Sequence, residues 1–590
     1  MKRAWKTSVL FMGLTAVFAA GPVWTVQAAP VAADTYAAIP GDAWAVVYVR
    51  NVADVEKKIM DVARKFDVPP MSALMMAKGF LGFMSGVNDA GDLALVVLPT
   101  DNMYAMDQSI ALLVPVTDYT ELTAALQLEP AEEGEGKIHK MINPNLPPIF
   151  MAPKGKFAVL APSVANVKKM LDATTGLQTV LAPHDLERAS DDDLTIWANA
   201  ATMVSSPMIS PFLTQLESMG SDTTFFKELQ SLQIGIKIAP AGVRLGLGMA
   251  FKEGSDMGKA AAMVKGTTDT MLTGLPAENY VLAYAGVTTK EAAEYGASQF
   301  NKQIDQILNN PALPKDKINQ DKLRELLDRA GTLIKPMRSL AIEVSALPGT
   351  AGDGGFIGFT KVVRVEGGAA TVLGQFKDIV GMLGSGLILD EEINKVLSTV
   401  QYVPGAETIA GVSVDHLVMK LNEIEDIDEE DLETAHKVIG KEGVLFRMGA
   451  VDTDHVVATF GGGAGRFETV VGLVKGKEAP LSRNPGIVST AKAMTSQRNA
   501  EMYLAVDSLL RMLSDIGKAT DEPFPVSMPQ INAPVGMVYY GVGKTAGQAD
   551  VFVPMELILQ IRDVVQALVR PAPPPPMPEP VQEAEPAMTE

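Results

Sequence analysis

Apolar and polar residues alternate along many short stretches of this chain, and this alternation constrains its fold more than any other feature. Residues 233–238 read Gln-Ile-Gly-Ile-Lys-Ile, and residues 244–247 read Arg-Leu-Gly-Leu. Because successive side chains of a strand point to opposite faces, such stretches predict strands with one buried face and one face that is wet or lightly covered. The link at residues 239–242, Ala-Pro-Ala-Gly, fits a hairpin. We therefore predict an α+β fold of mostly antiparallel sheet with helices packed on one face.

One order of predicted elements occurs twice, which divides the chain into halves at residues 29–270 and 271–570. A Pro-led turn, a β run and a helical pattern open both halves. Each half closes with two strands and a helix, at residues 232–264 and 537–568. We predict two tandem halves that arose by duplication. Because strand–helix units are common, chance similarity is the alternative.

Residues 1–28 have the three parts of a secretory signal. Basic residues precede an apolar stretch at residues 9–20, and the small-residue motif Val-Gln-Ala ends the segment. We predict export to the periplasm, the cell envelope or the medium, with cleavage after Ala28. An uncleaved anchor is the alternative, because no charge occurs between Lys6 and Asp34. After cleavage we expect no transmembrane span.

The C-terminal residues 571–590 differ in composition from the rest of the chain. Residues 571–578 are nearly all proline, which is incompatible with a helix or a central strand, and residues 579–590 are acidic. Such a segment buries too little apolar area to fold, so we predict a disordered tail. The tail acts either as a spacer or as a contact for other envelope proteins that bind proline-rich segments.

Composition excludes several classes of site. The 590 residues include no cysteine, so disulfides and cysteine-type zinc sites are impossible and stability must come from burial. The formal charge is 50 − 70 = −20, and it becomes −23 without the three basic residues of segment 1–28. A protein this acidic is not expected to bind nucleic acid or an anionic membrane through net charge.

No motif indicates a catalytic, cofactor or metal residue. The five histidines, His139, His184, His416, His436 and His455, form no close ligand pair. Ser489 and Lys492 match S-x-x-K, the spacing that lets a lysine reach a serine hydroxyl one helical turn away, but the further motifs of such enzymes are missing. A chance match is the better interpretation.

Three further clusters have structural interpretations. The glycines of residues 461–465 join a predicted strand to a helix, and we interpret them as a tight turn rather than an anion site. The acidic run at residues 423–431 lacks the glycine of a calcium loop and predicts a solvated helix start. A methionine group follows a helical pattern and predicts core packing rather than copper binding: Met71, Met75, Met76 and Met84.

Residues 39–43, 112–119 and 251–255 resemble segments of large exported proteins of unknown function that are frequent in planctomycete-type bacteria. The resemblance covers most of the chain after the signal, but its motifs are short and structural. It implies export and the duplicated fold. It implies no activity, and no site residue is carried over.

Three functions follow from these observations. The first is a non-catalytic envelope protein that binds or scaffolds other components, since a large exported chain shows no catalytic constellation. The second is a hydrolase of unfamiliar type, with Ser489 and Lys492 as its candidate residues. The third is a carrier of a lipid or another apolar ligand, which the apolar and methionine content favours.

Overall fold

The computed structural model describes residues 32–569 with short internal gaps. The predicted signal and the proline-rich tail lie outside the described residues. The gaps are residues 68, 70–71, 84, 102–107, 125, 132–136, 143–146, 220–221, 269–270, 278, 310–315, 349–354, 384, 425–426 and 522–530.

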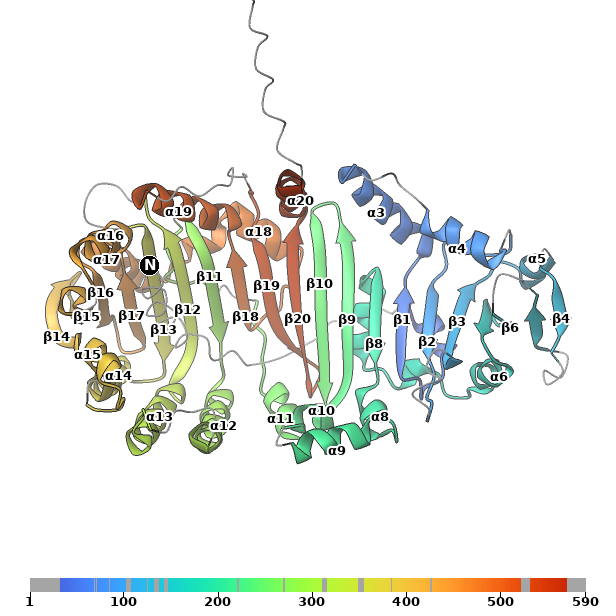
Figure 1. The fold of residues 1–590 in the computed structure, drawn as a ribbon, viewed down its shortest axis with the longest axis horizontal. Coiled ribbons are helices and arrows are strands. Elements are labelled where there is room, and N and C mark those ends of the chain that lie inside the picture. Colours follow the sequence, from blue (N-terminus) through green and yellow to red (C-terminus); the bar gives the residue numbers. More distant parts are fainter. Residues whose placement is uncertain are drawn as a thin grey trace, which may run out of the picture.

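Twenty strands form one antiparallel sheet that runs through the whole molecule (Figure 1). Those of the first half are β1 (Ala45–Val49), β2 (Leu93–Val97), β3 (Ile110–Pro115), β4 (Leu128–Pro130), β5 (His139–Met141), β6 (Ile149–Lys154), β7 (Phe157–Ala161), β8 (Leu194–Ala198), β9 (Leu229–Ala239) and β10 (Gly242–Phe251). Those of the second half are β11 (Tyr280–Val287), β12 (Met337–Ala346), β13 (Ile357–Val365), β14 (Val400–Ile409), β15 (Val412–Met419), β16 (Val444–Ala450), β17 (His455–Phe460), β18 (Ala500–Leu504), β19 (Val535–Val542) and β20 (Ala546–Pro554).

Helices connect the strands in both halves. The first half contains α2 (Ala33–Ala37), α3 (Val52–Lys65), α4 (Ala73–Leu81), α5 (Tyr119–Ala124), α6 (Val164–Asp172), α7 (Pro183–Asp191), α8 (Ala200–Ser205), α9 (Ser210–Ser218), α10 (Thr224–Glu228) and α11 (Asp256–Ala262). The second half contains α12 (Lys290–Asn309), α13 (Gln320–Ile334), α14 (Ala369–Leu383), α15 (Glu391–Ser398), α16 (Glu429–Ile439), α17 (Gly463–Gly476), α18 (Pro485–Lys492), α19 (Val506–Ala519) and α20 (Met555–Val569). The predicted α+β class is confirmed.

Local sequence explains many element boundaries. Asn51, Ser163 and Ser255 precede helices, and each side-chain oxygen accepts a hydrogen bond from the backbone N–H three residues on, at 3.1, 3.2 and 3.0 Å. Strand β1 is almost entirely valine, alanine and tyrosine, which favour a pleated surface. Strands β9 and β10 pair directly from Ala239 and Gly242, so the predicted hairpin at residues 239–242 is confirmed.

Strand order is the same in the two halves. From the outer edge to the centre, the first half runs β4-β5-β6-β7-β3-β2-β1-β8-β9-β10, and the second runs β14-β15-β16-β17-β13-β12-β11-β18-β19-β20. The halves meet where β10 pairs antiparallel with β20, from Gly242 opposite Pro554 to Ala250 opposite Ala546. The halves therefore share one continuous sheet. Their origin by duplication stays a prediction.

Helices cover both sides of the outer strands. Neighbouring residues of β3 show this: Leu113 packs in one buried cluster with helices α6 and α7, and Val114 packs in another with Leu122 of α5. In the second half, Phe467 of α17 and Ala369 of α14 belong to clusters on opposite sides in the same way. The cover is thus fuller than the one-sided packing expected from alternation. Among the described residues, one side lacks this cover only towards the centre of the sheet.

Candidate functional site

Strands β9 and β10 bury their polar side and expose their apolar side, whereas β8, β19 and β20 also bury apolar residues on that same buried side, namely Trp197, Val538 and Phe552. In β9, Gln233 is 2 % exposed and Gly235 is buried, whereas Ile234 between them is 37 % exposed. In β10, Gly246 is buried, whereas Leu245 and Leu247 are 44 % and 40 % exposed. The alternation predicted for these strands is confirmed. An ordinary soluble sheet, however, buries the apolar side of such strands.

The exposed apolar side chains form a continuous surface. Across the strands, Ile196 lies opposite Ile234, which lies opposite Leu247. In the next row, Ile236, Leu245, Val551 and Met537 are directly paired in the same way. Directly paired residues share a face. We call this surface the open face, defined by Ile196, Ile234, Ile236, Leu245, Leu247, Met537 and Val551.

The open face offers a ligand no charge and no free strand backbone. Alternation from its paired residues places no charged side chain on this side of β8, β9, β10, β20, β19 or β18. Each of these strands is paired on both edges, so its N–H and C=O groups are used within the sheet. Apart from the hydroxyl of Tyr539, which the same pairing places on this side, a molecule that lies on the open face meets apolar groups there.

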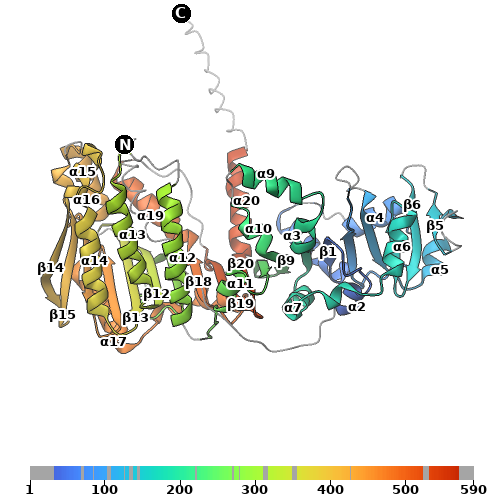
Figure 2. The same cartoon turned by 90° about the horizontal axis from the view of Figure 1, so that it is seen from below.

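Helices lie at the ends of the central strands rather than over the open face. Figure 1 shows β9, β10, β20 and β19 unobstructed, with α20 beyond one end and α8 to α11 beyond the other. In Figure 2, α7 and α17 lie on one side of the sheet, and α12, α14 and α20 project on the opposite side. The uncovered strip is therefore flanked by helices at both ends.

One end is closed by a contact between segments far apart in the sequence. The guanidinium Nη1 of Arg562 in α20 donates to Lys65 O of α3 at 2.6 Å and lies 3.3 Å from Asp67 Oδ2. The same guanidinium lies 5.9 Å from the ring centre of Phe66. Helix α3 also exposes Ile59, and α20 exposes Ile561, so the helices that flank the open face carry exposed apolar residues of their own.

The opposite side of the same strands carries a buried ion-pair network. Helix α7 places Arg188, which is 7 % exposed, between the two halves of the chain. Its Nη2 lies 2.5 Å from Asp550 Oδ1 of β20, and its Nη1 donates to the hydroxyl of Tyr540 in β19 at 2.8 Å. The Nε of Arg188 lies 3.2 Å from Asp192 Oδ2, one helical turn away. Arg188 thus links the first half directly to the second.

A second arginine completes this network. Arg244 Nη2 lies 2.6 Å from Asp191 Oδ2 and 2.6 Å from Asp192 Oδ1, and Lys237 pairs with Asp191. Three basic and three acidic groups therefore balance. We call them the ion-pair network: Arg188, Asp191, Asp192, Lys237, Arg244 and Asp550.

Glycines make room for the network on the sheet. A Cβ atom at Gly246 would lie 1.3 Å from Arg188 Nη2, and one at Gly235 would lie 1.8 Å from Asp192 Oδ2. Both glycines therefore let charged groups lie directly on the strand backbone. Burial alone lowers the pKa of the Arg188 guanidinium, but Tyr540, Asp550 and Asp192 outweigh it and raise that pKa. Burial raises the pKa of Asp192, and the two arginines oppose this shift.

The structure does not bring the sequence candidates together as a catalytic site. Ser489 and Lys492 are both exposed on α18, and the Ser489 hydroxyl donates to Gly486 O at 3.2 Å. Histidine pairs are local: His184 with Asp185, His416 with Glu407 and His455 with Asp452, at 3.4, 2.7 and 2.9 Å. Among the described residues, no group of three histidine, aspartate or glutamate side chains is arranged to hold a metal ion.

The glycine and acidic clusters agree with their structural interpretations. Gly461, Gly462 and Gly463 all have φ between 65° and 69°, the left-handed region that a tight turn before α17 requires. Asp428 accepts a hydrogen bond from Asp431 N at 2.8 Å and begins α16, as the helix-start interpretation predicts.

The methionine prediction is wrong where it can be checked. Met75 and Met76 are 65 % and 54 % exposed on α4, not buried in a core, because a helical pattern does not fix which side of the helix packs against the rest of the protein. Met71 and Met84 lie outside the described residues.

Sequence reasoning missed both the open face and the ion-pair network. The sequence did contain a signal for the network. Gly246 and Gly248 are two positions apart and therefore lie on the same side of β10, and Gly235 of β9 lies opposite Gly246. Small residues on one side of neighbouring strands leave space for large groups from another element. The sequence could not show that this element is α7, or that no helix covers the isoleucine and leucine side.

No family model matches this chain, and no curated protein is significantly similar to it. Crystal forms III, IV and I of TP0453 are among the solved structures that it resembles, with TM-scores of 0.22, 0.23 and 0.21 and identities of 9, 8 and 10 %. The matches cover 39, 41 and 39 % of this chain and 82, 89 and 81 % of TP0453. Similarity at this level carries no functional argument. The resemblance to planctomycete-type exported proteins stays a prediction.

Proposed function

We propose that this protein is an exported, non-catalytic binding protein that holds the acyl chains of a lipid on the open face. The observation that carries the proposal is the inverted burial of the central strands, where Ile234, Leu245 and Leu247 are exposed beside a buried Gln233. Soluble proteins rarely leave a continuous apolar surface of this kind uncovered unless something binds there.

The chemistry of the open face favours acyl chains over a protein partner. Protein interfaces carry about one hydrogen bond per 100–200 Å² and a polar rim. The open face provides no charged side chain and no free strand backbone group across six neighbouring strands. At a strand spacing of about 4.8 Å, the six strands make the open face roughly 25 Å wide. A hydrocarbon chain has no polar groups, so it needs no hydrogen-bond partner on the open face.

Exposed methionine suits a ligand of variable shape. Met537 is 36 % exposed on the open face, and Met249 and Met502 lie on the same side of β10 and β18. Methionine side chains are flexible and adapt to different apolar partners. Acyl chains that differ in length and unsaturation are such partners.

Lipid binding fits a protein that is exported from the cytoplasm. The N-terminal signal predicts a protein outside the cytoplasm, and the described part of the chain has no helix long and apolar enough to cross a membrane. A lipid that leaves a bilayer needs a covered apolar surface in the aqueous compartment. Binding to other envelope components through residues 571–590 stays compatible with this role.

The first test is extraction of the purified full-length protein with organic solvent, followed by mass spectrometry of the extract. We expect a stoichiometric lipid, and we expect oleate to displace a fluorescent fatty acid from the delipidated protein. A clean extract together with no uptake of the fluorescent fatty acid would overturn the proposal.

Matched variants locate the binding surface. Replacing Leu245 and Leu247 by glutamine should weaken fatty-acid binding at least tenfold, since two central apolar contacts are lost, while far-UV circular dichroism stays unchanged. Leu389→Gln is the control, because Leu389 is 52 % exposed and lies between α14 and α15, away from the open face. Equal loss in both proteins, or a dimer that dissociates in the double variant without bound lipid, would contradict the assignment.

A further inference from the structure

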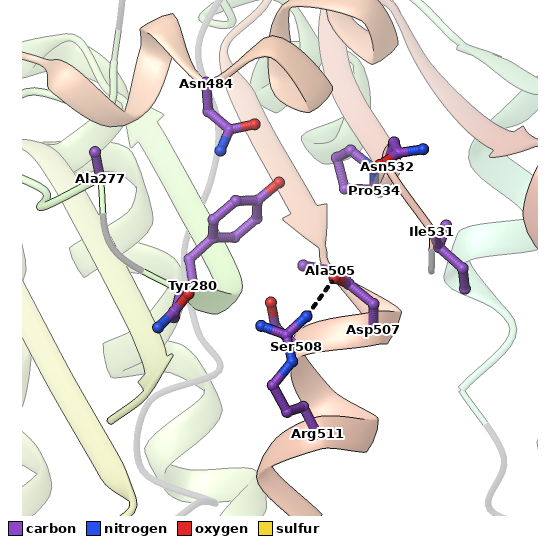
Figure 3. Close-up of a pocket in the computed structure, with 11 residues that line it drawn as sticks. Ala277, Tyr280, Asn484, Ala505, Asp507, Ser508, Arg511, Ile531, Asn532 and Pro534 are labelled. Carbon is purple, nitrogen blue, oxygen red and sulfur yellow. Dashed lines mark hydrogen bonds and ion pairs between the residues drawn. The ribbon is translucent and has the colours of Figure 1, made fainter. Parts of the chain in front are cut away.

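A polar pocket lies apart from the open face, at the ends of β11, β18 and β19. Its volume is about 270 Å³, and it is lined by residues at or next to these three strand ends and from the first turns of α19. Figure 3 shows the side chains of Tyr280, Asn484, Ser508 and Arg511 around it. None of these groups takes part in the ion-pair network.

Two hydroxyl groups in this pocket, on mostly buried residues, have no partner in the described part of the chain. Tyr280 is 5 % exposed and Ser508 is 8 % exposed, and neither hydroxyl has a hydrogen-bond partner among the residues that the structure describes. Figure 3 shows the Tyr280 hydroxyl pointing into the pocket, which Ser508 and Arg511 also line. Both hydroxyls are therefore free to donate a hydrogen bond to a ligand in the pocket.

The first turn of α19 adds further donors. Helix α19 is 14 residues long, and Ala505 precedes it without a side-chain cap. The first N–H groups of a helix have no partner within the helix, and the helix dipole favours a negative charge at that end. Arg511 stands one turn further on, 3.2 Å from Asp507. An exposed pair of this kind is weak, so the guanidinium can also serve a ligand.

We propose that this pocket binds an oxyanion group, either a phosphate or the carboxylate of a small molecule. Hydroxyl, guanidinium and helix N–H groups are all donors, and together they match the acceptor oxygens of such a group. Asp507 also lines the pocket, where its charge limits the negative charge that the pocket accepts. Burial and the nearby Asp507 raise the pKa of the Tyr280 phenol, so it remains protonated and donates at neutral pH.

The test is isothermal titration calorimetry of the full chain with inorganic phosphate and, separately, with acetate. We expect one of the two anions to bind and to raise the unfolding temperature, and the stronger one identifies the ligand class. Tyr280→Phe and Ser508→Ala should each weaken that binding about tenfold, because each removes a hydrogen bond to a charged group. Ser514→Ala, which changes a serine of the same helix outside the pocket, should bind like the original protein.

Stability without anion separates binding from a structural role. Because the Tyr280 hydroxyl has no partner among the described residues, Tyr280→Phe should unfold at the same temperature as the original protein or higher. A clear fall in that temperature would show a structural hydroxyl and overturn the assignment. Absence of binding and of any temperature shift with both anions would also overturn it.

Discussion

The two sides of the central strands differ in a way that reverses the usual rule of burial. In the described part of the chain, one side of β9 and β10 carries isoleucine and leucine and has no helix over it, whereas the other carries glycine, glutamine and arginine and is buried under α7. Both sides belong to the same strands, for example Gln233 and Ile234 of β9. The comparison teaches that a covering helix, rather than side-chain polarity, decides which side of these strands is buried.

Each side imposes its own physical demand. Charges such as Arg188 and Asp550 can be buried only because they are paired with each other and with Tyr540. The open face needs no partner to fold, but its apolar surface favours association with another apolar molecule. The buried side therefore holds the halves together, and the open side is available for a ligand.

The largest effect is expected when the buried side loses its central cation. Arg188→Ala leaves Asp550 buried without its ion-pair partner and Asp192 with Arg244 alone, and we expect a loss of about 3–5 kcal/mol in the free energy of unfolding. Urea unfolding measures it. Arg329→Ala, which removes an exposed ion pair with Glu325, should cost less than about 1 kcal/mol. Similar losses for the two variants would show that the network does not stabilise the junction.

Replacing leucine by alanine should cost more stability in the buried core than on the open face. Leu113 is fully buried in the core of the first half, so Leu113→Ala should cost about 2–5 kcal/mol. Leu247 is 40 % exposed on the open face, so Leu247→Ala should cost roughly 1 kcal/mol or less in the protein without lipid. Thermal and urea unfolding of delipidated protein measure both. A cost for Leu247→Ala as large as that for Leu113→Ala would mean that the open face is covered in solution.

Glycine substitution tests the fit of Arg188 on the sheet. Gly246→Ala places a Cβ atom on the guanidinium, so we expect a loss of about 1–3 kcal/mol as side chain and backbone shift. Gly374→Ala is the control with the opposite sign. Gly374 lies in α14 with no atom within 4 Å of an added Cβ, so alanine there should stabilise by about 0.5–1 kcal/mol. If both variants gain stability, Arg188 does not occupy its position over Gly246.

The smallest expected effect is the loss of stability when Asp191 is protonated at low pH. Burial opposes ionisation of Asp191, but hydrogen bonds and attraction from Lys237 and Arg244 lower the pKa of its carboxyl overall. Its contribution is therefore present above the unfolded pKa near ~3.9 and is lost as the pH falls through the folded value. Because Asp191 is half exposed, solvent screening keeps its contribution to the free energy of unfolding well below about 1 kcal/mol. The stability gap between the original protein and Asp191→Asn should close below about pH 4, and a gap that persists there would exclude this ionic origin.

The sequence predicted the elements of both sides but not their roles. Alternation placed strands at residues 233–238 and 244–247, and the proline–glycine link correctly indicated their hairpin. The same alternation did not say which side is buried, because a strand pattern is symmetric with respect to its faces until a partner is known. The prediction that Met75 and Met76 are buried was wrong for the same reason. A helical pattern predicts a helix, but it does not predict the element against which the helix packs.

By itself the sequence determined local structure: the α+β class, the strand and helix positions, the capped helix starts at Ser163 and Ser255, and the glycine turn before α17. The tertiary structure alone decided that β10 pairs with β20 across about half the chain, that α7 covers the polar side of the central strands, and that the apolar side stays open. The physical reason is range. Caps, turns and periodicity depend on residues a few positions apart, whereas burial depends on contacts between segments that no local pattern relates.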